Sequence, residues 1–407
     1  MNETILIHFF GRDRPGLIAE LTAILASHNT CVLDIGQAVV HEMLSLGLMV
    51  EIPRGESFHN VQNALTEKSK ALDLQVTFTS VTKTDLDEWI AAQGSAQFIV
   101  TILGRAISAN HLSRVSAIIA QHRMNVDRVD RLSGRLSLAV HTPDANACVE
   151  LTVSGDPSSE ASMRADFLVT AHDLKIDIAF QRESIFRRNR RLFAFDMDST
   201  LIEGEVIDEL AKLAGVADKV VKVTEAAMRG EIEFQESFRR RVALLRGLPE
   251  SKVRDLLHEI PLVQGAEQLI GTLKILGYKT AILSGGFNFF AHFLQAKLGI
   301  DYVFANDLDI DDGMVTGEVH TPIVDGPRKA ELLRQIARQE NISLDQVIAV
   351  GDGANDLPML GIAGMGIAFR AKPLVRQTAS HAVSFLGLDS LLYLIGVRDR
   401  DLRYSSK

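Results

Sequence analysis

An internal repeat is the feature that most limits how this chain of 407 residues can fold. The segment IAELTAILASH, from Ile18 to His28, aligns with LSRVSAIIAQH, from Leu112 to His122, at an offset of 94 residues with four identical positions. Around each copy, apolar runs and helical spacings follow the order β-α-β-β-α-β, which forms one two-layer sandwich. The repeat therefore predicts two ferredoxin-like domains at residues 1–83 and 96–182, joined by the polar segment Thr84 to Ser95.

The pattern changes from Leu192 onward to short apolar runs that alternate with helical segments. The expected strands are Leu192 to Phe195, Thr280 to Leu283, Tyr302 to Ala305, Val347 to Val350 and Met365 to Phe369. Helices between most of these strands favour a Rossmann-like parallel sheet covered on both faces, here at residues 192–396. A charged helical insertion at about 204–262 interrupts the first crossover, so we expect a helical cap above the carboxyl edge of the sheet, where open α/β folds bind ligands.

Composition excludes several classes of protein. The net charge of −9 argues against non-specific nucleic-acid binding, and we read the arginine-rich segment Gln181 to Arg191 as a solvated linker or helix end. Two cysteines, Cys31 and Cys148, are too few for a disulfide framework or a cysteine-based zinc site. No run of 18 uncharged apolar residues occurs, and the N-terminus lacks the pattern of a signal peptide. We therefore expect a cytoplasmic protein that makes no contact with membranes or nucleic acid.

The strongest chemical signal is the segment Phe195-Asp-Met-Asp-Ser-Thr200, which directly follows an apolar strand. In an extended chain Asp196 and Asp198 point the same way, and two carboxylates so close repel each other unless a cation lies between them. Hard oxygen ligands suit magnesium. Taken alone, the segment is also compatible with a strand that ends in a polar turn.

Three further segments follow strands or begin a helix in the same half of the chain. Gly351-Asp-Gly-Ala-Asn-Asp356 offers further carboxylates on a tight backbone path, and Ser284-Gly-Gly286 offers a hydroxyl and amides that can hold phosphate oxygens. Lys329 begins a helical segment between them.

These four motifs, in this order, resemble those of the haloacid dehalogenase superfamily of phosphotransferases. The resemblance covers about 192–395 and implies that Asp196 is the nucleophile and Asp198 the general acid/base. It also implies that Mg²⁺ is held by Asp196, Asp352 and the backbone carbonyl of Asp198. Phosphate would be bound by Ser284, Gly285, Lys329 and Asn355.

Substrate choice must come from the inserted cap. A zwitterionic amino acid needs an anion for its ammonium, a guanidinium for its carboxylate and apolar groups that exclude water. Glu205, Arg241, and the pair Met228 and Phe234 could supply these, although an amphipathic helix with solvated charges has the same composition. The spacing of these residues after Asp196 resembles the phosphoserine phosphatase family, in which the matching glutamate binds the substrate ammonium and the matching arginine its carboxylate.

The two N-terminal repeats look like ACT domains, small amino-acid-sensing modules that pair their sheets. The first repeat keeps the loop Gly11-Arg-Asp-Arg-Pro-Gly16 before its helix, whereas the second reads Gly104-Arg-Ala-Ile-Ser-Ala-Asn110 and lacks the Asp-Arg-Pro-Gly segment. The resemblance implies a serine effector at the first repeat, where Asp13 and exposed amides could receive an amino acid. The alternative is a platform for homodimerisation without a ligand.

The sequence thus predicts a phosphatase that converts O-phosphoserine to serine, the last step of serine biosynthesis, through an aspartyl-phosphate intermediate. One alternative is a phosphatase or phosphotransferase for another small monoester, such as phosphothreonine or a homoserine acceptor. Another is an amino-acid sensor with an inactive C-terminal domain, against which the four intact motifs argue.

Overall fold

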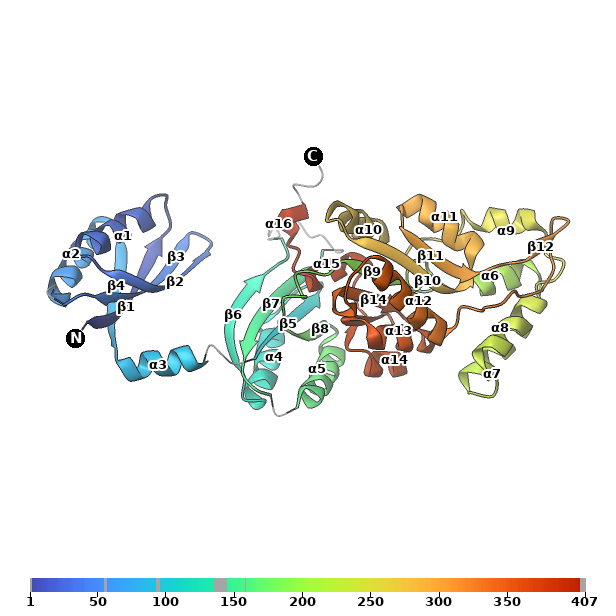
Figure 1. Cartoon of the computed structure of the whole chain (residues 1–407), viewed down its shortest axis with the longest axis horizontal. Coiled ribbons are helices and arrows are strands. Elements are labelled where there is room, and N and C mark those ends of the chain that lie inside the picture. The colour runs from blue at the N-terminus through green and yellow to red at the C-terminus, as the bar shows by residue number, and fades with distance from the viewer. Residues whose placement is uncertain (1, 55–56, 93–95, 135–144, 158, 403–407) are drawn as a thin grey trace. The chain divides into compact units, whose positions relative to one another are not determined.

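The computed structural model describes residues 2–54, 57–92, 96–134, 145–157 and 159–402, and Figure 1 traces them in order of colour. The chain divides into two compact units, Met1–Ser95 and Ala96–Lys407. Positions 93–95 of the predicted linker lie outside the described residues.

The first unit is a four-stranded antiparallel sheet, in the order β2-β3-β1-β4, with two helices on one face. Ile5, Ile7 and Phe9 alternate along β1 and are buried with residues of both helices, because successive side chains of a strand point to opposite faces. The elements are β1 (Glu3–Arg12), α1 (Leu17–Ser27), β2 (Cys31–Val40), β3 (Met43–Ile52), α2 (Phe58–Ala71) and β4 (Leu74–Val81). The predicted β-α-β-β-α-β order is confirmed.

The segment predicted to be a polar linker is partly a helix, α3 (Lys83–Ala92). Thr82 and Asp85 cap its first turn reciprocally: Thr82 Oγ1 donates to Asp85 Oδ2 at 2.6 Å, and the Asp85 amide donates to Thr82 Oγ1 at 3.2 Å. The spacing Thr-x-x-Asp is a capping signal that the sequence contains.

The second unit begins with a repeat of the first fold, in the equivalent strand order β6-β7-β5-β8. Ser108 caps α4 by accepting a hydrogen bond from the amide of His111. The elements are β5 (Gln97–Gly104), α4 (Ala109–Gln121), β6 (Asn125–Arg131), β7 (Ala147–Ser154), α5 (Glu160–Leu174) and β8 (Asp177–Arg182).

A six-stranded parallel sheet, in the order β11-β10-β9-β14-β15-β16, follows in the same unit. Side chains of β9 alternate between two hydrophobic cores: Phe193 and Phe195 pack on one face of the sheet, and Leu192 and Ala194 pack on the other. The strands are β9 (Leu192–Phe195), β10 (Lys279–Phe287), β11 (Tyr302–Asn306), β14 (Val347–Gly351), β15 (Met365–Phe369) and β16 (His381–Val383). The predicted fold class, a Rossmann-like sheet after two ferredoxin-like domains, is confirmed, and β16 is an edge strand that the sequence did not reveal.

Helices connect these strands and cover both faces. They are α10 (Ala266–Ile275), α11 (Asn288–Leu298), α12 (Gly326–Gln339), α13 (Leu357–Ile362), α14 (Pro373–Thr378), α15 (Leu391–Leu394) and α16 (Asp399–Leu402), with 3₁₀ turns at Leu344–Gln346, Ala354–Asp356 and Leu388–Ser390.

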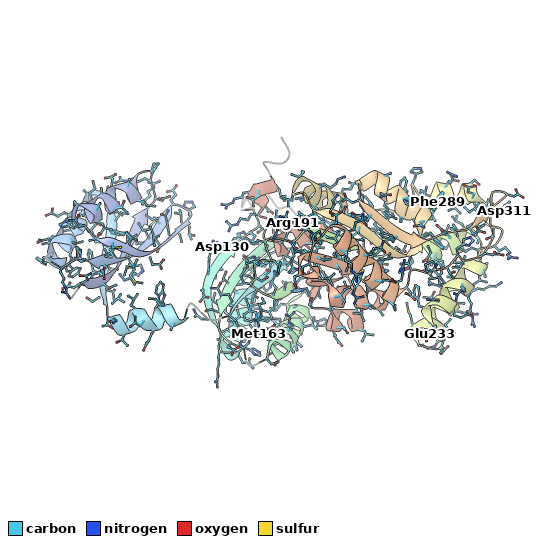
Figure 2. All side chains as sticks on the ribbon, in the orientation of Figure 1. Asp130, Met163, Arg191, Glu233, Phe289 and Asp311 are labelled. Atoms are coloured by element: carbon cyan, nitrogen blue, oxygen red, sulfur yellow. The ribbon has the colours of Figure 1, made fainter. Side chains whose placement is uncertain are left out.

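Four helices between β9 and α10 form the cap: α6 (Val206–Leu213), α7 (Ala217–Met228), α8 (Phe234–Ala243) and α9 (Glu250–Leu256). An unpredicted hairpin, β12 (Ile310–Asp311) and β13 (Met314–Val315), lies against the cap. The amide of Gly247 donates to the carbonyl of Val315 at 2.8 Å, and the amide of Val315 donates to the carbonyl of Leu248 at 2.9 Å. Figure 2 labels Glu233 before α8 and Asp311 in this hairpin.

The arginine-rich segment is solvated only in part, because Arg182, Arg188 and Arg191 are exposed whereas Arg187 and Arg190 are buried. Arg187 is 2% exposed and forms ion pairs with Glu150 and Glu183, while buried Arg190 donates to the carbonyl of Asp345. Two of these partners, Glu150 and Asp345, lie far away in the sequence, so composition alone does not reveal that the two guanidiniums can be buried. No helix in the described ranges is long and apolar enough to cross a membrane.

Candidate active site

The two aspartates of the first motif lie in the loop after β9, the strand between β10 and β14. The carboxyl ends of these parallel strands meet at one edge, which brings their loops together. The side chain of Asp196 accepts a hydrogen bond from the amide of Met197 at 2.7 Å, and that of Asp198 accepts one from the amide of Val206, the first residue of α6, at 2.9 Å. The loop therefore fixes both carboxylates and joins one of them to the cap.

Lys329 connects the loops after β9 and β14. Asp325 caps α12 by accepting from the amide of Arg328 at 3.0 Å, which places Lys329 in the first helical turn. The fully buried Lys329 Nζ lies 2.8 Å from Asp196 Oδ1 and 2.7 Å from Asp356 Oδ1. Burial lowers the pKa of this ammonium, but the two carboxylates outweigh burial, so that the pKa is raised overall and the lysine stays charged.

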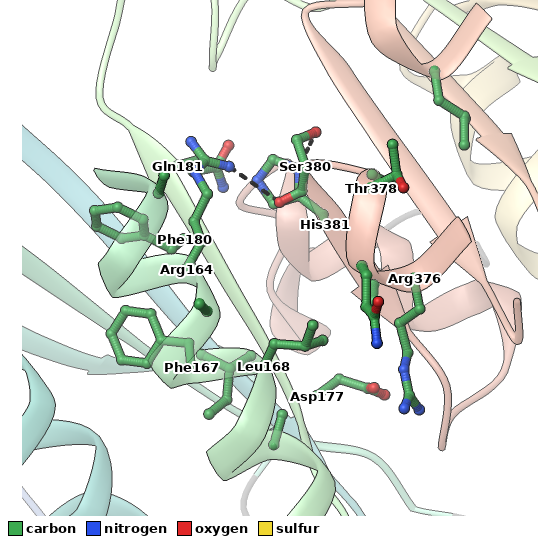
Figure 3. A pocket seen from close by; sticks show the side chains of 18 of the residues that line it. Arg164, Phe167, Leu168, Asp177, Phe180, Gln181, Arg376, Thr378, Ser380 and His381 are labelled. Atoms are coloured by element: carbon green, nitrogen blue, oxygen red, sulfur yellow. Dashed lines mark hydrogen bonds between the residues drawn. The ribbon is translucent and has the colours of Figure 1, made fainter. Parts of the chain in front are cut away.

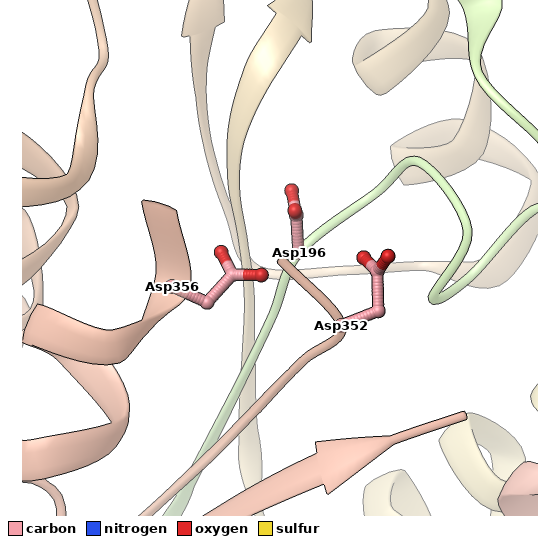
Figure 4. A group of neighbouring side chains, drawn as sticks. All are labelled: Asp196, Asp352 and Asp356. Atoms are coloured by element: carbon pink, nitrogen blue, oxygen red, sulfur yellow. The ribbon is translucent and has the colours of Figure 1, made fainter. Parts of the chain in front are cut away.

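Three carboxylates converge at this point (Figure 4). Oxygen atoms of Asp196, Asp352 and Asp356 lie within 4.8 Å of one another. Asp356 is already bonded on both oxygens, by Lys329 and by the amide of Gly353 at 2.9 Å. Within the described part of the chain, Asp352 accepts only one hydrogen bond, a long one of 3.5 Å from Thr200 Oγ1.

The donor set fits a divalent cation. Burial first, and then the charges of Asp196, Asp356 and Glu205, raise the pKa of Asp352 to about 8; Lys329 opposes this rise but does not outweigh it, so the negative charge at the site exceeds the positive charge. Carboxylate oxygens in this arrangement suit Mg²⁺ or a similar hard ion. Asp198 was expected to contribute through its backbone carbonyl, which stays a prediction; its side chain is bonded to the cap instead.

Asp198 has the environment of a protonated acid. Its side chain is buried, and burial, followed by the charges of Glu205 and Asp196, raises its pKa well above the usual range. A carboxyl group with a raised pKa can donate a proton near neutral pH.

The irregular carboxyl end of β10, where its register with β11 shifts between Leu283 and Phe287, supplies the Ser-Gly-Gly segment beside these carboxylates. Ser284 Oγ accepts from the amide of Gly286 at 2.9 Å, and a Cβ at Gly286 would lie 2.5 Å from Asp198 Oδ2. The glycine therefore allows the backbone to approach the acid closely. On the β14 loop, Asn355 lies against Gly353, where a Cβ would lie 2.2 Å from Asn355 Oδ1.

The four predicted cap residues differ in their surroundings. Phe234 lies over the carboxyl end of β10, since a Cβ at Gly285 would be 3.0 Å from its Cζ. Glu205 accepts from Ser199 Oγ at 3.4 Å. Arg241 is half-buried, and its Nε is buried without a hydrogen-bond partner among the described residues. Met228, at the end of α7, is 63% exposed.

Sequence reasoning missed residues that hold these loops. Buried Asn306 donates to the carbonyl of Gly285 at 2.9 Å and accepts from the amide of Val324 at 2.8 Å. Gln235 of the cap donates to Asp325 Oδ2 at 2.7 Å, which ties α8 to the start of α12. A polar residue at the end of an apolar strand was the available signal for Asn306; nothing in the sequence pattern distinguishes Gln235.

Comparison with known families agrees with the fold. Residues 190–364 match the model of the haloacid dehalogenase-like hydrolases, and residues 3–79 and 96–181 each match an ACT domain. The chain is 40% identical to the phosphoserine phosphatase of Streptomyces coelicolor, over 97% of this chain and 92% of that protein. It is 38% identical to the phosphoserine phosphatase of Mycobacterium tuberculosis, over 97% of this chain and 93% of that one.

Among solved structures, a haloacid dehalogenase family hydrolase from Salmonella enterica aligns with a TM-score of 0.63 and 29% identity, covering 74% of this chain and 99% of that one. Full-length similarity at this level, together with the hydrolase domain, shows that the chain is a phosphatase enzyme with two ACT domains and belongs to the phosphoserine phosphatase family.

Proposed function

We propose that this enzyme hydrolyses O-phosphoserine to serine and phosphate in the cytoplasm, as the last step of serine biosynthesis. The buried Asp196–Lys329–Asp356 network beneath a cap that carries Glu205 and Arg241 is the observation that supports this proposal most. The named full-length relatives support the choice of substrate.

In the first step, a carboxylate oxygen of Asp196 attacks phosphorus and the bond from phosphorus to the serine oxygen breaks. Asp198 gives its proton to the departing serine oxygen, for which its raised pKa suits it. Lys329 places its charge beside the attacking carboxylate and the transferred group.

In the second step, Asp198, now a carboxylate, takes a proton from water. The water oxygen attacks phosphorus, the bond to Asp196 breaks, and phosphate and the original carboxylate are released. General acid–base help of this kind contributes about 10²–10⁴-fold to the rate.

We propose Mg²⁺ as the metal, held by Asp196, Asp352 and the backbone carbonyl of Asp198. When bound, it would supply positive charge that offsets the repulsion between the Asp196 carboxylate and the phosphate dianion. Phosphate oxygens would be held by Ser284 and the amide of Gly285, at the carboxyl end of β10, and by Asn355, in the loop after β14.

The cap residues would bind the amino-acid part of the substrate. Glu205 would receive the ammonium, Arg241 the carboxylate, and Met228 with Phe234 would exclude water. The unpartnered Nε of Arg241 supports this role, because a buried N–H group without a hydrogen-bond partner favours an anionic ligand that accepts from it.

A phosphate-release assay of the full chain with Mg²⁺ tests the substrate. We expect kcat/KM for phosphoserine to exceed that for phosphothreonine and for simple monoesters. Comparable values for all esters would support the alternative phosphatase, and transfer of phosphate to homoserine would support the phosphotransferase.

We further propose that L-serine acts as an effector at the first ACT domain and that these domains pair in a homodimer. In the first domain Gly16, in a left-handed conformation, directly precedes α1, and exposed Asp13 lies in the same loop. Asp13→Asn should weaken serine inhibition of the full chain without changing uninhibited turnover. Unchanged inhibition would place the serine site elsewhere, including the active site.

A further inference from the structure

Strand β10 leaves the regular sheet at the segment that we propose to bind phosphate. It pairs with β11 up to Leu283 and again at Phe287, and the pairing skips the segment Ser284-Gly-Gly286 between them. Two of the three skipped residues are glycines, whose backbone has wide conformational freedom. Contacts other than the sheet ladder must therefore hold this segment in one conformation.

Larger residues in place of the glycines could not stiffen the segment. A Cβ at Gly286 would lie 2.5 Å from Asp198 Oδ2, and a Cβ at Gly285 would lie 3.0 Å from Phe234 Cζ. The glycines are needed for this close approach of Asp198 and the cap, although they leave the backbone loose. A restraint on the segment has to come from a side chain outside it.

Asn306, the last residue of β11, supplies such a restraint and is only 3% exposed. Its Nδ2 donates to the carbonyl of Gly285 at 2.9 Å. The amide of Gly286 belongs to the same peptide group and donates to Ser284 Oγ at 2.9 Å. Because this peptide is planar and trans, its carbonyl and its amide point to opposite sides, and the two bonds hold the plane from both.

The same bonds determine how the hydroxyl of Ser284 can interact with a ligand. Its Oγ accepts from the amide of Gly286, and it donates to no acceptor in the part of the chain that the structure describes. A hydroxyl has one proton to donate, so this proton stays available for a ligand oxygen. Because Ser284 is fully buried, an unused donor at this position favours an anion such as the phosphate group.

The other end of the Asn306 side chain reaches the segment that leads to Lys329. Its Oδ1 accepts from the amide of Val324 at 2.8 Å. The next residue, Asp325, caps α12, and its carbonyl accepts from the amide of Lys329 at 2.8 Å. One buried side-chain amide thus joins the Ser284 segment to the first turn of the helix that carries the lysine.

We propose that Asn306 is a positioning residue of the phosphate site. It holds the peptide between Gly285 and Gly286 so that Ser284 offers its proton to a phosphate oxygen, and it keeps this hydroxyl in place relative to Lys329. The inference rests on the proposed function, in which Ser284 and Lys329 bind the phosphate group. Asn306 acts through these two residues.

Inhibition of p-nitrophenyl phosphate turnover by inorganic phosphate tests the inference on the full chain. Asn306→Leu keeps the approximate size of the side chain and removes both bonds. The Ki for phosphate should rise about 10-fold, as expected for the loss of one or two neutral hydrogen bonds. A purely structural role would lower Tm and the fraction of active enzyme but would leave Ki unchanged.

The same variant should affect all phosphate esters alike. Its kcat/KM should fall by up to about 100-fold, the loss that a misplacement of about 1 Å produces. The factor should be equal for phosphoserine and p-nitrophenyl phosphate, because the phosphate group is common to both. A loss confined to phosphoserine would place the effect in the cap and overturn the inference.

Gln181→Leu is the matched control. Gln181 is also buried, and its Nε2 donates to the carbonyl of Leu394 at 3.2 Å. It lies in a cleft between α5 and β16 that none of the proposed site residues lines (Figure 3). This variant loses a bond of the same kind, so it should lower Tm while leaving the Ki for phosphate unchanged.

A second variant guards against misfolding of Asn306→Leu, with circular dichroism as the measure of folding. Asn306→Asp keeps the bond from Val324 and loses the donor to Gly285, so it decides if the leucine variant is misfolded, and its Ki should also rise. Misfolding of both variants would show that Asn306 serves the fold itself and would overturn its role in positioning.

Ser284→Ala separates this inference from the proposed function. Its Ki for phosphate should rise, and the double variant with Asn306→Leu should raise Ki by less than the product of the single effects, because one residue acts through the other. An unchanged Ki in Ser284→Ala would overturn the phosphate site itself. A raised Ki in Ser284→Ala, together with an unchanged Ki in folded Asn306→Leu or with fully multiplicative effects, would overturn only the role of Asn306.

Discussion

Charged side chains have many partners in the floor of the active site and few in the cap. The floor, formed by Asp196, Asp198, Ser284, Lys329, Asp352 and Asp356, keeps its lysine fully buried and bonded to two carboxylates. The cap presents Glu205 and Arg241 with few partners, and the Nε of Arg241 has none among the described residues. A prearranged floor suits chemistry common to all phosphate esters, whereas a cap with unsatisfied charges needs a substrate that completes it. Damage to the floor should therefore abolish every reaction, and damage to the cap should change substrate preference.

The largest effect is expected from Asp196→Asn. An amide cannot attack phosphorus, so turnover of phosphoserine and of p-nitrophenyl phosphate should both vanish while circular dichroism stays unchanged. Substantial phosphate release from pure variant protein would remove Asp196 from the role of nucleophile.

Lys329→Ala should abolish turnover and also weaken the fold. Removing one partner from a buried ion pair costs about 3–5 kcal/mol, since the other charges stay buried without compensation. Denaturant unfolding measures the loss, and Lys297→Ala is the control because that lysine is exposed, with a 3.8 Å contact to Glu267. Equal stabilities of the two variants would mean that the Lys329 network contributes little to the fold.

Arg241→Ala should distinguish the role of the cap from that of the floor. KM for phosphoserine should rise about 10–150-fold through the loss of one charge-assisted hydrogen bond, with little change for p-nitrophenyl phosphate. Arg240→Ala is the matched control on the same helix, because Arg240 is exposed and paired with Glu236 at 2.7 Å. Equal losses on both substrates would show that Arg241 supports the cap rather than the substrate carboxylate.

Met228→Ala should have the smallest effect. The side chain is 63% exposed, so its removal should change KM for phosphoserine only a few-fold and leave thermal stability unaltered. A loss as large as that of Arg241→Ala would indicate that the cap moves to bury Met228 when substrate binds.

The floor was predictable because its residues lie at, or within a few residues of, the carboxyl ends of buried strands or in the first turn of a helix, and parallel strands bring their carboxyl ends together. The sequence could not reveal that both oxygens of Asp356 are bonded, which sets it apart from Asp352. The same limit applies to Arg187, whose partner Glu150 lies 37 residues away in the sequence. From sequence alone a charged residue is interpreted as solvated, because only the fold shows which partner lies beside it.

Local signals were also overlooked. The reciprocal cap of Thr82 and Asp85 marks the start of α3 in a segment interpreted as a linker. The two-residue strands β12 and β13 are too short for periodicity to detect, and they depend on backbone bonds to Gly247 and Leu248 of the cap.

Covalent labelling tests the division between floor and cap most directly. The wild-type chain and Arg241→Ala are each mixed with radiolabelled phosphoserine at saturating concentration, quenched in acid and digested. We predict that label appears on the peptide containing Asp196 in both proteins, because the cap governs binding and the floor governs the chemistry. Label on another residue, or none during steady turnover of the wild type, would contradict the account.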